Sequence, residues 1–346
     1  MRFKIAFLVA LFSILNLGSF AQNTDTTFAK QWLEIDTLII SKNLTQQALQ
    51  KVNILYAKAK KQQFYAQQIK CLLYQFGLEE KVADNNPNKR IAILKAEINS
   101  TDNVVMKSIL YSLLAKQYQN YFNQNRYKFY GRSNIANTKN EDILTWSAND
   151  FHKAITANYL LSIDQKNTLQ QYNLKGYAAI ILKRNANNLR PTMFDLLAHE
   201  ALDYFKTGEA YIAKPSYAFV VDDASALSTM DVFATANFNS KDTASHLLNC
   251  LHIFQQLITL HKNDINALID VDLERIQWVK QQAAMVGKEM LYKAALEDIT
   301  ARFSSNANTS QVWYLLANIE AEKAATYKPF EDTTNRYDYL KAKQII

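Results

Sequence analysis

The chain has 346 residues and a formal net charge of +7, from 39 Lys and Arg against 32 Asp and Glu. These basic residues are dispersed rather than grouped, so the sequence lacks the electrostatic footprint of a nucleic-acid-binding protein. Six Gly and four Pro are far below average usage, which argues against a fold built on many tight turns and favours stacked helices.

The first 21 residues have the three parts of an export signal in the right order. Arg2 and Lys4 form the positive end, and the apolar core over 5–17 is too short to span a bilayer. Ser19-Phe20-Ala21 places small residues where a signal peptidase reads, and Gln22 stands where a lipid-anchored precursor would need Cys. We therefore expect an exported chain without a transmembrane segment, in the periplasm, at the cell surface or secreted.

Apolar residues recur at helical spacing along almost all of the mature chain. In 45–60, for example, one stripe consists of Ala48, Leu49, Val52, Leu55, Tyr56 and Ala59. The same pattern predicts helices over 27–41, 45–60, 63–83, 89–98, 101–125, 148–163, 192–206, 244–262, 265–286, 288–303 and 310–326. The breaks between them are short and polar, and no strand is convincingly indicated.

The spacing of these helices predicts an all-α fold, an α-solenoid of antiparallel helix pairs. Residues 22–243 form a helical region with long loops, at 126–140 and 207–241, and residues 244–346 form helical repeats. The pair 288–326 is similar to a tetratricopeptide repeat, although the consensus Gly and the closing Pro are missing. The fold is therefore expected to be tetratricopeptide-like towards the C-terminus.

Two cysteines, Cys71 and Cys250, are too few for a disulfide framework. Each lies in an apolar helical stretch. The sequence leaves two alternatives open: a single disulfide, if the fold brings them together, or two buried thiols.

The stretch "RPTMFDLLAHEALDYF", Arg190 to Phe205, contains His-Glu on a predicted helix and so raises the question of a zinc protease. Such a helix needs His at i and i+4, but Asp203 stands four residues after His199. The apolar stripe of this helix predicts that His199 and Asp203 lie on the opposite, polar side, with no third ligand nearby. Thr192 and Asp195 have capping-box spacing, which favours a helix start rather than a catalytic loop.

Other candidate groups are no stronger. His246, His252 and His261 share a helix at steps that turn them to different sides, and His152 stands alone. Scattered glycines exclude a nucleophile elbow and a phosphate-binding loop. The acidic group Asp222-Asp223 and the group Asp270, Asp272 and Glu274 are more typical of a solvated face than of a cation site. "NRYKFYGR", 125–132, has a composition that can stack single-stranded bases, but we expect its aromatics to pack on the helices. We therefore expect no catalytic, cofactor-binding or metal-binding residue and no nucleic-acid partner.

Several stretches together resemble the helical N-terminal region of large exported bacterial alpha-2-macroglobulin family proteins. The most specific is "LRPTMFDLLAHEALDYF", because the family has a similar arginine-proline-threonine helix start. The other similar stretches are 32–38, 47–52, 54–60, 68–70, 142–146, "YKAALEDITARF" at 292–303 and "RYDYLKAKQII" at 336–346.

This resemblance implies a non-catalytic exported scaffold, the N-terminal part of a protease-trapping protein whose partners are downstream macroglobulin domains. Neither Cys71 nor Cys250 has the Cys-Gly-Glu-Gln context of the family's thioester, so no trapping chemistry is carried over. The apolar end Ile345-Ile346 leads us to expect a truncated reading frame or a split gene. The alternative is an independent tetratricopeptide-like module that binds a peptide or an envelope protein.

Overall fold

The computed structural model describes residues 24–81, 87–130, 132, 142–181, 188–208, 215–331 and 333–346. Over these residues the chain is 73% helical, with 14 α-helices and no strand. The nearest approach to a sheet is one isolated bridge between Asn173 and Thr192. The prediction of an all-α fold is confirmed for this part of the chain, and the predicted signal peptide, 1–21, lies outside it.

The α-helices are α2 (Thr24–Ile40), α3 (Thr45–Lys61), α4 (Tyr65–Lys81), α5 (Pro87–Ser100), α6 (Val104–Tyr130), α7 (Ala148–Ile163), α8 (Lys166–Leu169), α9 (Met193–Phe205), α10 (Met230–Thr235), α11 (His246–His261), α12 (Ile265–Gln282), α13 (Lys288–Arg302), α14 (Ser310–Ala324) and α15 (Asp338–Ile345). Some α-helices are joined by short connections, as α3 and α4 are, and others by longer ones, as α8 and α9 are. Single 3-10 turns are η1 (Ile143–Thr145), η2 (Leu174–Tyr177), η3 (Ala224–Leu227) and η4 (Ala307–Thr309).

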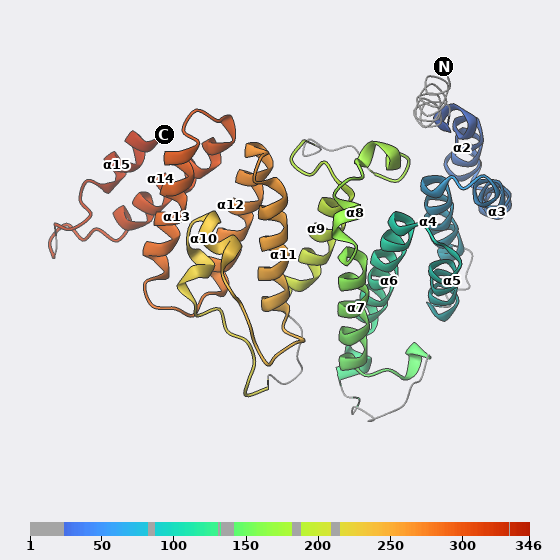
Figure 1. Ribbon diagram of the computed structural model, residues 1–346, viewed down its shortest axis with the longest axis horizontal. Helices are drawn as coiled ribbons and strands as arrows, with labels where there is room; N and C mark the ends of the chain where they lie inside the picture. Colours follow the sequence, from blue (N-terminus) through green and yellow to red (C-terminus); the bar gives the residue numbers. More distant parts are fainter. Residues whose placement is uncertain are drawn as a thin grey trace, which may run out of the picture.

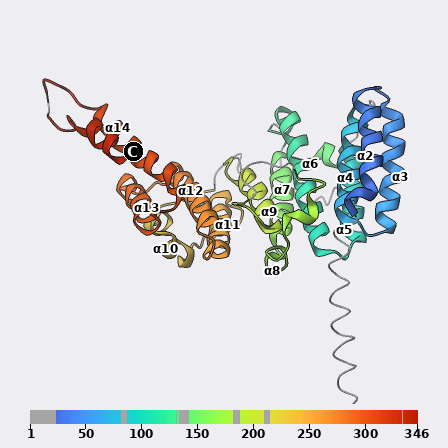
Figure 2. The same cartoon turned by 90° about the horizontal axis from the view of Figure 1, so that it is seen from above.

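The helices form an elongated array with α2 and α3 at one end and α14 and α15 at the other (Figures 1 and 2). Most helices contact the next one along the chain, as α6 contacts α7 and α11 contacts α12. Helix α9 lies in the middle of the array. It contacts α6 and α7 on one side and α11 on the other. Polar residues of α9 such as Asp195 and His199 are therefore buried.

The helix boundaries agree with the sequence pattern within a few residues for most helices, but two predicted loops are partly wrong. Helix α6 continues to Tyr130, so the first residues of the loop predicted at 126–140 are helical. The continuation is explained by Phe122 and Phe129, seven residues apart on one face, whose rings both pack against Phe151. The loop predicted at 207–241 contains η3 and the short helix α10.

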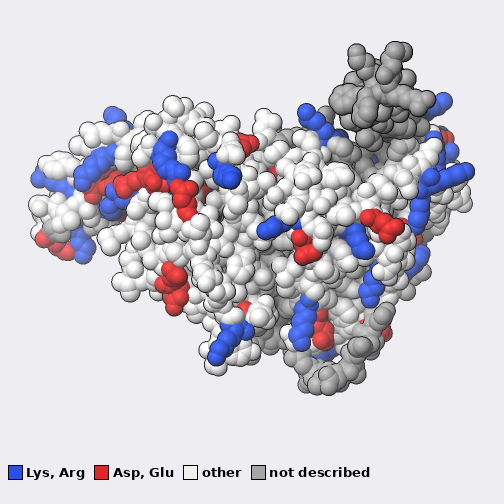
Figure 3. All heavy atoms as spheres, in the orientation of Figure 1, with Lys and Arg blue, Asp and Glu red and all other residues white. Residues whose placement is uncertain are grey.

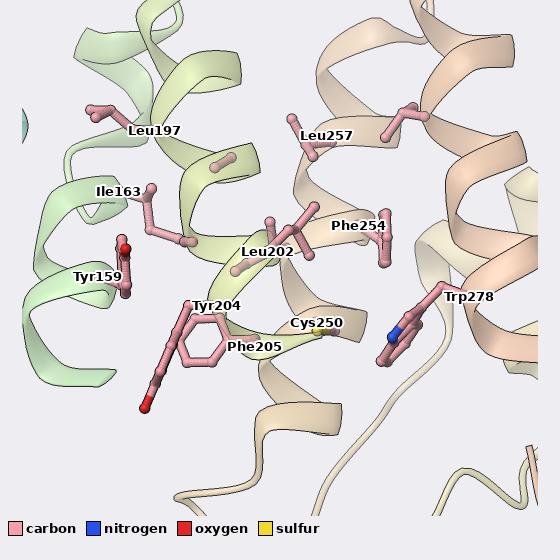
Figure 4. Packing of buried hydrophobic residues seen from close by; sticks show 14 of the residues in the cluster. Tyr159, Ile163, Leu197, Leu202, Tyr204, Phe205, Cys250, Phe254, Leu257 and Trp278 are labelled. Carbon is pink, nitrogen blue, oxygen red and sulfur yellow. The ribbon is translucent and has the colours of Figure 1, made fainter. Parts of the chain in front are cut away.

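Buried apolar side chains form two clusters. The smaller one joins α2 and α3 to one side of α4, with Trp32, Val52 and Cys71 among its members. The larger one begins at Ile69, on the other side of α4, and runs to Leu316 in α14. Its central part, between α7, α9, α11 and α12, is continuous in Figure 4. The larger core thus includes residues on both sides of residue 243. The boundary between two regions that the sequence predicts there stays a prediction.

The two cysteines are free thiols with no exposed surface, and they belong to different clusters. Burial raises the pKa of the Cys71 thiol to about 12 and that of Cys250 further. Of the two alternatives left by the sequence, the structure has the pair of buried thiols. In the part of the chain that the structure describes, no helix is both long and apolar enough to cross a bilayer.

A fully buried arginine attaches the segment of η3 and α10 to the array. Arg275 of α12 pairs with Asp272 at 2.7 Å, donates to the backbone oxygens of Ala226 and Ser228, and lies 4.4 Å from the ring centre of Phe233. Arg275 is 0% exposed and Asp272 is 1% exposed. A buried charge is costly unless it is paired, so Arg275 and Asp272 depend on each other inside the protein. The hydrogen bonds from Arg275 to Ala226 and Ser228 hold η3 and α10 against α12.

We expect Arg275→Met to lower the free energy of unfolding by about 3–5 kcal/mol, because the Asp272 carboxylate would remain buried without its partner. Urea denaturation followed by circular dichroism measures the change. Lys51→Met is the control: it removes an exposed ion pair with Glu34 and is expected to cost less than about 1 kcal/mol. Equal stabilities of Arg275→Met and the wild type would contradict the anchoring role.

Candidate functional site

Helix α9 begins with a capping box, as its sequence predicts. The Thr192 side chain accepts a hydrogen bond from the backbone N–H of Asp195 (3.2 Å), and Asp195 Oδ2 accepts from the backbone N–H of Thr192 at 2.8 Å. Helix α7 begins in the same way with Ser147 and Asp150. Residues 190–195 are therefore a helix start rather than a catalytic loop, as the capping-box spacing predicts.

Asp195 also makes a contact that α7 has no counterpart for. Its second oxygen, Oδ1, lies 2.6 Å from Nε2 of His261, the last residue of α11. Asp195 is 0% exposed and His261 is 4% exposed. One carboxylate thus caps α9 and joins it to α11 inside the core, 66 residues along the chain.

His199 lies inside the protein, and here the sequence prediction is wrong. It is 7% exposed rather than on a polar outer face, because the side of α9 opposite its apolar stripe meets α12. Its Nδ1 lies 2.8 Å from the backbone oxygen of Asp195, and its Nε2 lies 3.4 Å from Glu274, without hydrogen-bond geometry. Asp203, also predicted on that side, is exposed and lies 3.6 Å from Lys206.

Glu274 of α12 is the centre of the ion pairs between α9 and α12. Arg190 donates to one of its oxygens at 3.2 Å, and Lys206 donates to the other. Burial alone would raise its pKa, but the neighbouring His199 and Lys206 outweigh burial and lower the pKa to about 2. The Glu274 carboxylate is therefore charged, and its ion pairs join the two helices. Asp270 lies 3.6 Å from Arg190 at the edge of this group of charges.

On its other side, α9 contributes to a cluster of polar aromatic residues. His152 Nδ1 lies 2.9 Å from the Tyr204 hydroxyl, and the ring centres of Tyr204 and His246 are 4.7 Å apart. Burial and the nearby His152 lower the pKa of His246 to about 3, so this imidazole is neutral. A cavity of about 250 Å³ opens beside His152 and Tyr204, with Arg126 of α6 in its lining.

The remaining sequence candidates are spread over the molecule. Asp222 and Asp223 are exposed, and Asp223 caps η3. In the 125–132 stretch, Phe129 is buried as expected, whereas Tyr127 is 93% exposed. Among the described residues, no three His, Cys, Asp or Glu side chains lie close enough to hold a metal ion.

The arrangement is one of internal joints. The buried Asp195 and His199 of α9 face α11 and α12, where they contact His261 and Glu274. Sequence reasoning missed Glu274 as the partner of His199 and Arg275 as an anchor. No local signal reveals either, because each depends on contacts between elements 47 to 84 residues apart.

Comparison with protein-family models, with curated proteins and with solved structures gives no match to this chain.

We expect Asp195→Ala to be more destabilising than the equivalent change in α7, Asp150→Ala. Both variants lose a capping box, worth about 1 kcal/mol, but Asp195→Ala also leaves the buried His261 without its partner, at a further cost of about 1–3 kcal/mol. Urea denaturation of the two variants measures the difference. If their free energies of unfolding were equal, the Asp195–His261 contact would contribute nothing to the joint.

The low pKa of Glu274 predicts a loss of stability in acid. In the unfolded chain a Glu titrates near 4.5, so the stabilisation is complete above that pH and is lost as the pH falls towards 2. At neutral pH it is worth about 3 kcal/mol at most. Urea midpoints from pH 7 to pH 3 should therefore show Glu274→Gln well below the wild type at pH 7, with the difference reduced to about half by pH 3.

The control is Glu331→Gln, which changes an exposed glutamate paired with Lys328 and should follow the wild type at every pH. A constant gap between Glu274→Gln and the wild type across the pH range would show that the charge of Glu274 does not matter.

Proposed function

We propose that this protein is a non-catalytic, exported helical scaffold that positions protein partners, equivalent to the N-terminal region of a bacterial alpha-2-macroglobulin family protein. The observation that carries the proposal is the use of Asp195, His199 and Glu274 as links between helices. These are groups that acid–base chemistry would need, and all three contact side chains of neighbouring helices. The sequence stretch that contains two of them is also the most specific part of the family resemblance.

In the proposed architecture, the helices form an α-solenoid of antiparallel pairs that is tetratricopeptide-like towards the C-terminus. Contacts between consecutive helices support this view, as does the burial of Leu296 of α13 and Ala317 of α14. An array of this kind offers a long surface relative to its core, which suits a scaffold.

The partners proposed for the scaffold are macroglobulin domains. A second candidate, an independent tetratricopeptide-like module for an envelope partner, is favoured by the apolar surface of α14 and α15, where Tyr314, Tyr339 and Leu340 are each more than half exposed. The charges on the face in Figure 3 are dispersed, with Lys and Arg interleaved with acidic residues near α13–α15, and do not form a basic patch for nucleic acid.

A scaffold without trapping chemistry should leave proteases untouched. We expect purified chain mixed with trypsin to give no adduct that survives denaturing electrophoresis, and to leave cleavage of a large and of a small substrate equally fast. Adduct formation, or inhibition restricted to the large substrate, would contradict the proposal. Stoichiometric zinc in the purified protein, lost in His199→Ala, would also contradict it.

Reading the neighbouring DNA separates the two candidates. A coding region for macroglobulin domains whose product co-purifies with this chain supports the macroglobulin scaffold. The absence of such a region supports the independent module.

A further inference from the structure

A cleft of about 530 Å³ lies between α8 and α11, away from the joints already described. This volume is within the range of about 300–1,000 Å³ that is usual for ligand sites. The α8 wall carries Lys166, Asn167 and Gln170. The opposite wall is the solvent-facing side of α11.

The α11 wall is a continuous polar stripe. His252, Gln255, Gln256 and Thr259 follow one another at spacings of three, one and three residues, which places them on one side of a helix, and Leu260 completes that side. The opposite side of α11 is buried in the larger core. The cleft is therefore lined mainly by side-chain amides on rigid helical backbone.

Two of these residues fix the α11 wall in place. The Gln255 amide nitrogen donates to the backbone oxygens of Phe233 (2.9 Å) and Ala236 (2.7 Å). His252 Nε2 lies 3.0 Å from the backbone oxygen of Phe238. These bonds tie the segment after α10 along α11 and leave both side chains with little freedom.

Three other amides are not occupied in this way. Asn167, Gln170 and Gln256 line the cleft and make no side-chain hydrogen bond with the described residues. An amide side chain offers both a donor and an acceptor, and so does each residue of an extended peptide. Amides of this kind can pair with the N–H and C=O groups of a main chain.

We propose that this cleft binds a short extended segment of a protein partner through its main chain, with one carboxylate of that segment against Lys166. The inference rests on the proposed function as a scaffold for proteins and names the chemistry by which it would hold a partner. The polar stripe from His252 to Thr259 spans about 10 Å along α11, which is the length of about three extended residues.

The charged and aromatic side chains that line the cleft indicate which kind of ligand it binds. Lys166 is the one charged side chain among the described lining residues, and none of them is a carboxylate, so a segment with a single negative charge is favoured over a basic one. Sugar recognition commonly stacks rings on aromatic faces. The described lining has only the His252 imidazole, whose Nε2 contacts Phe238, which favours a peptide over a glycan.

The test begins with a displayed library of random 12-residue peptides selected against the full chain, in parallel with an unrelated helical protein. Fluorescence anisotropy then gives the Kd of a labelled, enriched peptide for each variant. We expect Asn167→Ala with Gln256→Ala to raise this Kd about tenfold, because two hydrogen bonds to the main chain are lost. The matched control is Gln46→Ala with Gln47→Ala, two exposed amides on α3, and should leave the Kd unchanged.

Two further measurements address main-chain recognition and charge. N-methylation of the central peptide bonds should weaken binding as much as the double substitution does, and Lys166→Gln should weaken only peptides with a carboxylate. The proposal is overturned if no peptide is enriched over the unrelated protein, if both double variants bind equally, or if N-methylation has no effect. Binding of oligosaccharides that is lost in Asn167→Ala with Gln256→Ala would overturn it in favour of a glycan. None of these failures touches the scaffold proposal, which the protease experiment tests without using the cleft.

Discussion

The burial of α9 on two opposite sides is the constraint on which the rest of the structure depends. A surface helix can leave its polar side in water, but α9 contacts α6 and α7 on one side and α11 and α12 on the other. A charge buried on either side of α9 then needs a partner inside the protein, since an unpaired buried charge costs several kcal/mol. The Asp195 carboxylate has two such partners: it caps its own helix at Thr192, and it contacts His261 of α11. The consequence is a central joint between α9 and α11, which electrostatic and apolar contacts hold together.

That joint explains why ionisable residues gather between α9, α11 and α12. A catalytic acid or base needs access to a substrate and a pKa matched to its task. Glu274, with its pKa lowered to about 2 by His199 and Lys206, is instead held as a permanent anion between two helices. His246, whose pKa is lowered to about 3, is a neutral ring packed against Tyr204 and Phe205. Perturbed pKa values mark functional sites in many proteins, but structural ion pairs produce them as well.

Residues 226–238, between α9 and α11, are attached to α12 and to the outer side of α11. Arg275 holds η3 and α10 from inside α12, and Gln255 and His252 hold the residues after α10 from the outer side of α11. A stretch with little regular structure is thereby fixed at several points by main-chain hydrogen bonds. This rigidity matters for the cleft between α8 and α11, because a wall that does not move loses less entropy when a partner binds.

The sequence by itself determined the helices, the capping boxes and the all-helical class, because these depend on residues three or four positions apart. Helix α7 and the start of α9 follow directly from Ser147, Thr192 and the apolar spacing after them. Only the tertiary structure decided which side of α9 is buried, that Phe129 prolongs α6 against Phe151, and that Glu274 and Arg275 are anchors. The reason is that the periodicity of one helix reports one apolar stripe and carries no information about a second neighbour. His199 lies on the side that such a stripe predicts to be exposed, and it is buried because α12, contributed from more than 60 residues away, covers it.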